Sequence, residues 1–232
     1  MVDLARMKAH GSAGLLAGLL ACLVTCPVAL RTASGQAPAP ALAAPQQHAS
    51  GLGFSYTVPG DWEVVDSQGK LPGVREQAGK NAGSDEEKKG LACVQVALTA
   101  RHGDPASVMI EVALPFDCFG EPMTEAQLPG FASGASEGLK QSFDLGEPVT
   151  ANYSLGSHTM WIERVKGTPK GHPELPYTVE ITCGLLKKAA VCWMAMAADD
   201  TALRTFERGV VNLDGESSGA LVPPTAFDKK PS

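Results

Sequence analysis

Basic residues are few and widely spaced in this chain. Its 232 residues include 19 lysines and arginines against 25 aspartates and glutamates, which gives a formal net charge of −6. The basic residues cluster only as pairs, such as Lys187-Lys188. Because a protein that binds nucleic acid needs a concentrated positive surface to hold the phosphate backbone, we expect no nucleic acid partner.

The chain also lacks the spacings typical of metal and redox sites. Its histidines and cysteines form no His-x-x-His or Cys-x-x-Cys pair, the spacings on which zinc sites and thiol oxidoreductases are commonly built. His102, His158 and His172 each stand beside glycine, serine or proline, as turn residues often do. We expect no metal site and no cofactor, and we interpret Asp199-Asp200 as a helix cap.

No apolar run reaches the length of about 20 residues that a membrane-spanning helix needs. The longest run, Ala13–Leu30, has 18 residues and contains a threonine and a proline. It follows basic residues and precedes an Ala/Pro-rich stretch, so it predicts a secretory signal peptide over residues 1–35 and a mature chain that begins near Gln36. The protein is therefore expected to be exported, as a periplasmic or secreted protein.

Two alternatives stay open for this N-terminal segment. The first alternative to cleavage is that the segment is retained as an anchor. The second is lipidation, since Leu19-Leu20-Ala21-Cys22 loosely resembles a bacterial lipobox. Membrane attachment is expected only in these two cases. Cleavage would remove three of the 19 basic residues and one of the 25 acidic residues, which leaves 16 and 24 and a formal net charge of −8.

The rest of the chain divides by composition into three parts. Residues 36–50 are rich in alanine, proline and glutamine and predict a flexible tether. Residues 51–214 carry the hydrophobic patterns and suffice for one globular domain with a single core, although 67–90 predicts a long surface excursion between strands. Residues 215–232 are polar and are expected to form a flexible tail.

Alternating apolar and polar residues predict strands throughout the globular part. A Pro59-Gly60 turn joins 53–58 to 62–65, so we expect these two segments to form a hairpin. Further strands are predicted at about 91–100, 108–114, 149–155, 158–166, 177–185 and 190–197. Helical patterns occur only in the middle and near the end, which indicates an α+β fold built on a mostly antiparallel sheet flanked by helices.

Two segments have the 3.6-residue pattern of a helix. Thr124 and Gln127 have the spacing of a capping box ahead of the first helix, and either Asp199 or Asp200 caps the second. The residues expected to face the core are Leu128, Phe131, Ala132, Ala135 and Leu139 in the first helix, and Leu203, Phe206 and Val210 in the second.

The cysteines of the mature chain predict two disulfides, because exported proteins fold in an oxidising compartment. A short loop at Lys187-Lys188 places Cys183 opposite Cys192 and puts the apolar residues around both on one face, while Glu180 and Thr182 take the other face. Cys93 and Cys118 are left to pair with each other. Two buried thiols packed as small hydrophobes are the alternative for Cys183 and Cys192.

The string Gly134-Ala-Ser136-Glu-Gly138 matches the G-x-S-x-G nucleophile motif of α/β-hydrolases. That motif requires a strand, a sharp turn and then a helix, whereas the residues before Ser136 already have a helical pattern. Asp144 with His158 or His172 would be the nominal partners of Ser136. We interpret Ser136 as part of a helix surface that carries small residues for close packing, and no catalytic residue is assigned.

Two other features bear on ligand binding and on modification. Trp62, Trp161 and Trp193, with Met194 and Met196, could line a pocket for an apolar ligand, although such residues more commonly pack in a core. The sequon Asn152-Tyr-Ser is a glycosylation acceptor only if the host glycosylates exported proteins.

The segment GFSYTVPGDW, from Gly53 to Trp62, resembles the start of PsbP-like domains, with an apolar strand, a Pro-Gly turn and a tryptophan that opens the next strand. The resemblance extends in outline over residues 51–214. It implies an α/β/α sandwich and a non-enzymatic binding or assembly role. No binding motif of that family matches residues of this chain.

These observations predict an exported, non-enzymatic binding or assembly protein whose partner is an unknown protein or a small apolar ligand. Two alternatives remain: a small exported serine hydrolase that uses Ser136, and a carrier of an apolar ligand.

Overall fold

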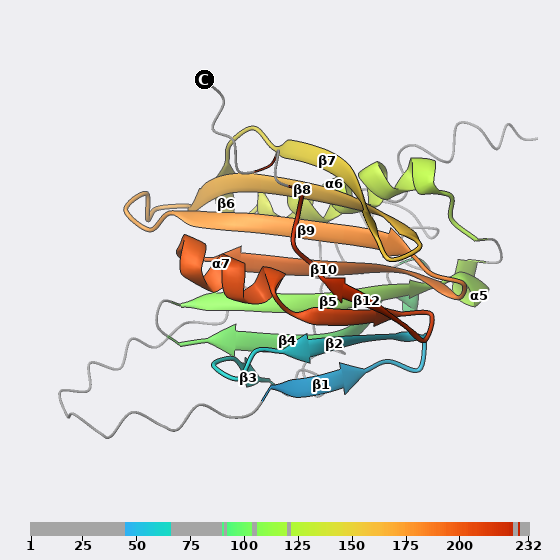
Figure 1. Cartoon of the computed structure of the whole chain (residues 1–232). Coiled ribbons are helices and arrows are strands. Elements are labelled where there is room, and N and C mark those ends of the chain that lie inside the picture. The colour runs from blue at the N-terminus through green and yellow to red at the C-terminus, as the bar shows by residue number, and fades with distance from the viewer. Residues whose placement is uncertain are drawn as a thin grey trace, which may run out of the picture.

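A computed structural model of the chain describes residues 45–65, 90, 92–103, 106–119, 122–224 and 227. The predicted signal peptide, residues 36–44 of the predicted tether and all of the predicted 67–90 excursion except Gly90 lie outside these residues. The described strands form two antiparallel sheets with helices packed on them (Figure 1). The expected α+β class with a mostly antiparallel sheet is therefore confirmed.

The larger sheet has eight strands in the order β3-β4-β5-β10-β9-β8-β6, and β7 pairs with β8 beside β6. Its hairpins follow the order of the chain for the most part, so most neighbouring strands are also neighbours in sequence. The strands are β3 (Glu63–Val64), β4 (Gln95–His102), β5 (Ser107–Pro115), β6 (Phe143–Leu145), β7 (Val149–Leu155), β8 (His158–Pro169), β9 (Tyr177–Leu185) and β10 (Ala189–Ala197).

The smaller sheet joins the two ends of the domain in the order β1-β2-β11-β12. Its strands are β1 (Gln46–Ala49), β2 (Phe54–Val58), β11 (Val210–Leu213) and β12 (Glu216–Ala220). The helical elements are α5 (Phe116–Phe119), the 3₁₀ turn η1 (Glu125–Gln127), α6 (Leu128–Leu139) and α7 (Asp200–Glu207).

Both faces of the large sheet are covered. Helix α6 packs on one face, while the small sheet and α7 lie on the other face, toward the viewer in Figure 1. Strand β10 is buried along its whole length because it faces both cores. Cys192 and Met194 point toward α6, whereas Trp193 and Ala195 point toward the small sheet.

Helix α6 agrees with its sequence pattern. The Thr124 N–H donates to the Gln127 side chain at 2.7 Å, which forms the capping box, and Pro129 stands in the first turn, where its missing N–H costs no hydrogen bond. The whole expected stripe is buried against the sheet: Leu128, Phe131, Ala132, Ala135 and Leu139.

The expected hairpin at the start of the domain is wrong. Strand β2 lies in the small sheet and β3 lies in the large one, because the chain turns between the layers at Pro59, whose carbonyl accepts the Trp62 N–H at 3.0 Å. The prediction that Val210 faces the core from the second helix is also wrong. It begins β11 and is 43% exposed.

The tether and tail predictions fail in part. Gln46–Ala49, inside the predicted tether, pairs with β2 as β1, and Glu216–Ala220, inside the predicted tail, pairs with β11 as β12. Both segments are polar and short, so their sequences carry no alternation. They are strands because β2 and β11 form an adjacent pair whose two outer edges accept them.

The structure contains both disulfides, Cys183–Cys192 and Cys93–Cys118. The register of β9 and β10 is the predicted one, with Cys183 opposite Cys192, Ile181 opposite Met194 and Val179 opposite Met196. Cys183 and Cys192 are fully buried under α6.

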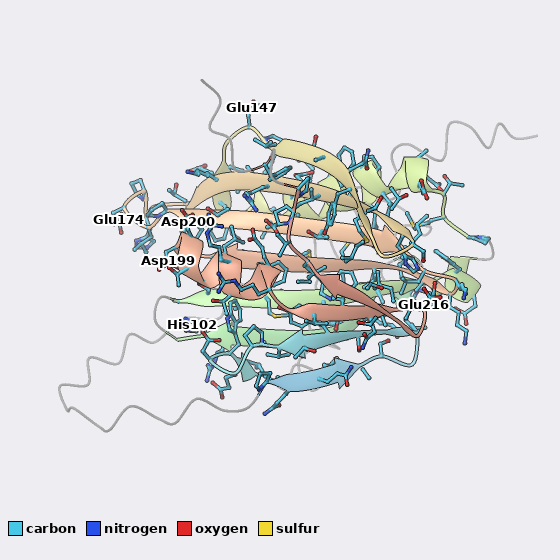
Figure 2. The ribbon with its side chains drawn as sticks, viewed as in Figure 1. His102, Glu147, Glu174, Asp199, Asp200 and Glu216 are labelled. Carbon is cyan, nitrogen blue, oxygen red and sulfur yellow. A yellow bond between two sulfur atoms is a disulfide. The ribbon has the colours of Figure 1, made fainter. Side chains whose placement is uncertain are left out.

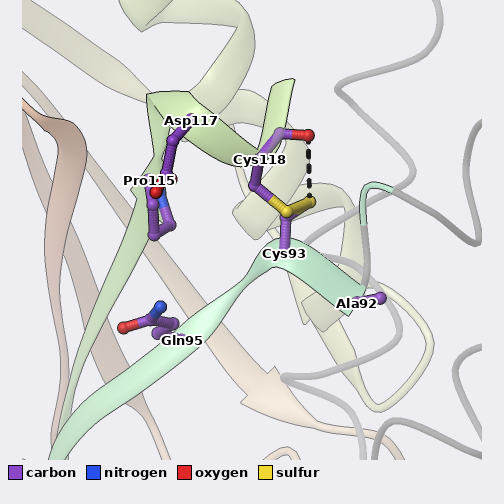
Figure 3. A pocket seen from close by; sticks show the side chains of 6 residues that line it. All are labelled: Ala92, Cys93, Gln95, Pro115, Asp117 and Cys118. Carbon is purple, nitrogen blue, oxygen red and sulfur yellow. Dashed lines mark hydrogen bonds between the residues drawn. A yellow bond between two sulfur atoms is a disulfide. The ribbon is translucent and has the colours of Figure 1, made fainter. Parts of the chain in front are cut away.

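The Cys93–Cys118 disulfide lies at the surface. Cys118 is exposed on α5, and a hollow of about 270 Å³ next to it is lined by Ala92, Cys93, Gln95, Pro115, Asp117 and Cys118 (Figure 3). Reagents can therefore reach this disulfide, whereas the protein core separates the other one from solvent.

We predict that a mild thiol reductant without denaturant opens Cys93–Cys118 only, because a thiolate must reach a sulfur atom to attack it. Alkylation followed by peptide mapping should label Cys93 and Cys118 and leave Cys183 and Cys192 unlabelled. Simultaneous labelling of all four would contradict the burial of the second pair.

Gly209 allows a close approach between α7 and β2. The Phe206 carbonyl at the end of α7 accepts the Tyr56 O–H at 2.9 Å and the Gly209 N–H at 2.9 Å. A Cβ atom on residue 209 would collide with the Tyr56 ring, which is fully buried and cannot move aside.

We therefore expect Gly209→Ala to destabilise the protein by about 1–3 kcal/mol, the usual cost of overpacking a core. Gly130→Ala is the control, because a Cβ there meets no neighbouring atom within 4 Å and alanine favours the helix. Urea unfolding measures both variants. Equal stability of Gly209→Ala and wild type would show that the contact with Tyr56 is not tight.

Candidate functional site

The Ser136 hydroxyl is hydrogen-bonded within its own helix. It lies on the buried face of α6, and its Oγ–H donates to the Ser133 carbonyl at 3.0 Å. Asp144 lies on β6, and the ring of His172 contacts Glu174 at 3.2 Å. The nucleophile motif therefore forms a helical turn, not the strand-to-helix elbow that catalysis requires.

His158 makes a largely buried hydrogen-bonding contact with Asp214, which the sequence did not indicate. Its Nε2 lies 3.0 Å from Asp214 Oδ2, and the Asp214 carboxylate also accepts the Lys187 N–H at 3.2 Å. Three hairpin turns thus meet at one end of the sandwich. Ser157 Oγ lies 3.5 Å from the other ring nitrogen, at the limit of hydrogen bonding.

The aspartates before α7 act as expected. Asp199 caps the helix and accepts the Ala202 N–H at 2.8 Å, and Figure 2 shows Asp199 and Asp200 at this end of α7. Among the residues that the structure describes, no group of three or more histidine, cysteine, aspartate or glutamate side chains is placed to hold a metal ion.

A row of polar side chains is buried between the large sheet and the layer of α7 and the small sheet. Across the strands, Glu111 faces Trp193, and Trp193 faces Thr182. Polar atoms of all three side chains have no hydrogen-bond partner within the described part of the chain. The sequence placed Thr182 on the polar face of its strand, but the second layer buries that face too.

Glu111 is the most unusual member of this row. It is completely buried, and burial raises its pKa to about 8. The Trp193 N–H is close enough to favour the charged form slightly, but it completes no hydrogen bond with either carboxylate oxygen. Glu111 is therefore protonated at neutral pH. One glutamate in the apolar run 108–114 was the only sequence signal for it.

Arg164 forms buried ion pairs with two glutamates, Glu180 and Glu207. Its Nη2 lies 2.6 Å from Glu180 Oε2 on β9 and 2.5 Å from Glu207 Oε1 on α7, and the Phe227 ring lies over the guanidinium at 4.9 Å. Burial raises the pKa of Glu180 above its usual range, and the ion pair with Arg164 opposes the rise. The cluster fastens α7 and the C-terminal segment to the sheet.

An apolar groove lies between the end of α7 and the first strands of the small sheet. Its volume is about 290 Å³, and it is lined by Pro45, Thr57, Pro59, Thr205, Arg208, Gly209 and Val210. Arg208 is the only charged residue among the described residues that line it. Gly209, another lining residue, packs closely on the buried Tyr56 ring.

The aromatic and methionine residues do not line a common pocket. Trp193 belongs to the core under the small sheet, whereas Met194 and Met196 belong to the core under α6. Trp161 packs at the edge of the α6 core and Trp62 in the other one. These residues serve packing, which removes the observation that suggested an apolar-ligand carrier.

The helices of the described residues are all too short or too polar to cross a membrane.

Comparisons with known proteins give structural similarity only. Neither a protein-family model nor a curated protein matches the chain. Among solved structures, the chain is similar to the solution structure of cyanobacterial PsbP (CyanoP) from Synechocystis sp. PCC 6803, with 12% identity, a TM-score of 0.43, and coverage of 74% of this chain and 90% of that chain.

The chain is also similar to LpqN, a protein involved in cell envelope biogenesis of Mycobacterium tuberculosis. The identity is 15% and the TM-score 0.39, with coverage of 73% of this chain and 90% of LpqN. The first of the two proteins is a PsbP, the family that the opening motif of the sequence resembles.

We predict that Glu111→Gln stabilises the protein, and more so as pH rises. Glu111 holds a proton in the folded state up to about pH 8 but loses it near pH 4.5 when unfolded. The contribution of this proton to the free energy of unfolding is therefore fully present below pH 4.5 and is lost as pH rises toward 8. At roughly 1.4 kcal/mol per pH unit, the advantage of the variant should grow by about 3 kcal/mol between pH 5 and 7.5.

Urea unfolding of both proteins at these two pH values measures this difference. Glu216→Gln is the control, because Glu216 is exposed. A stability difference between Glu111→Gln and wild type that does not change with pH would show that Glu111 is already charged in the folded protein.

Proposed function

We propose that this chain is an exported, non-enzymatic binding or assembly protein that docks a partner protein in the groove between α7 and the small sheet. The supporting observation is the groove itself, an apolar surface in which Gly209 packs on the buried Tyr56 ring. Preformed apolar surfaces with few, fixed polar groups are typical of binding sites.

The chemistry of the groove specifies the kind of partner. Val210 and the two prolines offer apolar surface, and Arg208 places one guanidinium at the rim. A partner that inserts an apolar side chain and places a carboxylate beside Arg208 would complement both features, because arginine pairs with carboxylates in a two-pronged geometry.

Export is supported by the signal-peptide pattern at residues 1–35 and by the two disulfides. The absence of enzyme activity is supported by Ser136, whose hydroxyl is bound to its own helix. The hydrolase alternative requires that this hydroxyl turn toward a histidine, for which α6 offers no strand-to-helix turn.

The groove is tested with a photo-reactive amino acid at Val210 in the native host. The control is the same substitution at Val64, which is similarly exposed at 41% but lies on β3, outside the groove. We expect a defined protein adduct from position 210 that is absent from position 64 and reduced by Arg208→Glu.

Equal adducts from both positions, or none from position 210, would contradict docking in the groove. An adduct of lipid at position 210 would favour the carrier instead. Labelling of wild type but not Ser136→Ala by a fluorophosphonate probe would show that the protein is a serine hydrolase.

A further inference from the structure

Strand β7 closes one side of the large sheet and presents an open edge. It pairs with β8 on its inner side, and no other described strand pairs with its outer side (Figure 1). The opposite end of the sheet is closed by β3, which has only two residues, and Glu63 there forms an ion pair with Arg101 at 2.7 Å.

The β7 edge has none of the features that keep edge strands from pairing. Proteins usually protect such edges with charged residues, proline, bulges or very short strands. Strand β7 has seven residues, VTANYSL, without a charge or a proline, and its register with β8 is uninterrupted. An unprotected edge of this length suggests that another strand covers it.

The hairpin turn fixes which backbone groups point outward. Gly156 and Ser157 form a two-residue turn with Gly156 at φ +59°, so the Leu155 carbonyl faces the His158 N–H as a bonded pair. Bonded pairs recur at every second residue of an antiparallel ladder. Thr150, Asn152 and Ser154 therefore direct their N–H and C=O groups away from β8, and their side chains are exposed.

We infer that the partner strand is β7 of a second copy of this chain, antiparallel and centred on Asn152. In that register Asn152 faces its own equivalent, and Thr150 faces Ser154 of the second copy. The outward N–H and C=O groups of Thr150, Asn152 and Ser154 then face outward groups of the second copy, because each of these residues is paired with another of the three. This self-association goes beyond the proposed function, since it uses a different surface from the groove.

The side chains in this register complement each other on both faces. Val149, which is 54% exposed, lies opposite Leu155 of the second copy, whose side chain packs in its own core, and Ala151 lies opposite Tyr153 of the second copy. Polar residues meet polar residues on the other face. Glu147, at the margin of the molecule beside β7 in Figure 2, faces Ser157 of the second copy and not another carboxylate.

Such a contact is isologous, so it closes as a two-fold dimer and does not continue into a fibre. Seven residues extend about 24 Å, and an interface of one strand pair belongs to the small, weak class. We therefore expect a dimer that dissociates on dilution.

The test is sedimentation of the full mature protein over about 1 to 500 μM, made in a host that does not glycosylate Asn152. The wild-type mass should rise toward twice that of the monomer. Asn152→Lys and Asn152→Asp should each weaken the dimer at least tenfold, because position 152 faces its own equivalent. Mixing the two variants should restore dimers, since opposite charges then meet.

Val64→Lys is the control on the other edge and should dimerise as wild type does, and circular dichroism verifies that every variant is folded. A monomeric wild type at 500 μM, a dimer that Asn152→Lys leaves intact, or a mixture that stays monomeric would each overturn the inference. A cross-linker at position 152 that captures only a different protein would overturn it as well.

Discussion

The burial of β10 on both faces is the constraint on which the rest of the structure depends. All nine of its residues are buried, so each face of the large sheet needs a covering layer. Helix α6 supplies one layer, and the paired ends of the chain, β2 and β11, supply the other together with α7. The second layer also covers the polar residues of the neighbouring strands, which places Glu111 and Glu180 in the interior.

The fold accommodates these two buried glutamates in different ways. Glu180 shares the Arg164 guanidinium with Glu207, so an ion pair offsets part of its desolvation. Glu111 has no such partner in the described part of the chain, and burial instead favours its neutral form. A buried carboxyl either binds a cation or keeps its proton, and this interior contains one example of each.

Local patterns predicted most strands of the large sheet and even the register of β9 with β10, because Cys183, Ile181 and Val179 must share a face with their partners. They did not predict the second layer. Alternation along β9 indicates one buried face, and only the packing of β2 and β11, about 150 residues apart, buries the other. The groove combines residues from both ends of the chain, so no local signal marked it.

The same layering explains why the proposed recognition surfaces lie at the periphery. Three groups with acid, base or nucleophilic chemistry are bound within the fold: Ser136 to its helix, His158 to Asp214, and Glu180 to Arg164. The apolar groove and the backbone edge of β7, in contrast, stay accessible in the described part of the chain. We propose that both surfaces recognise a protein, the groove by shape and the β7 edge by main-chain hydrogen bonding. Because these side chains join the layers of the fold, the proposed binding relies on apolar surface and backbone groups at its periphery.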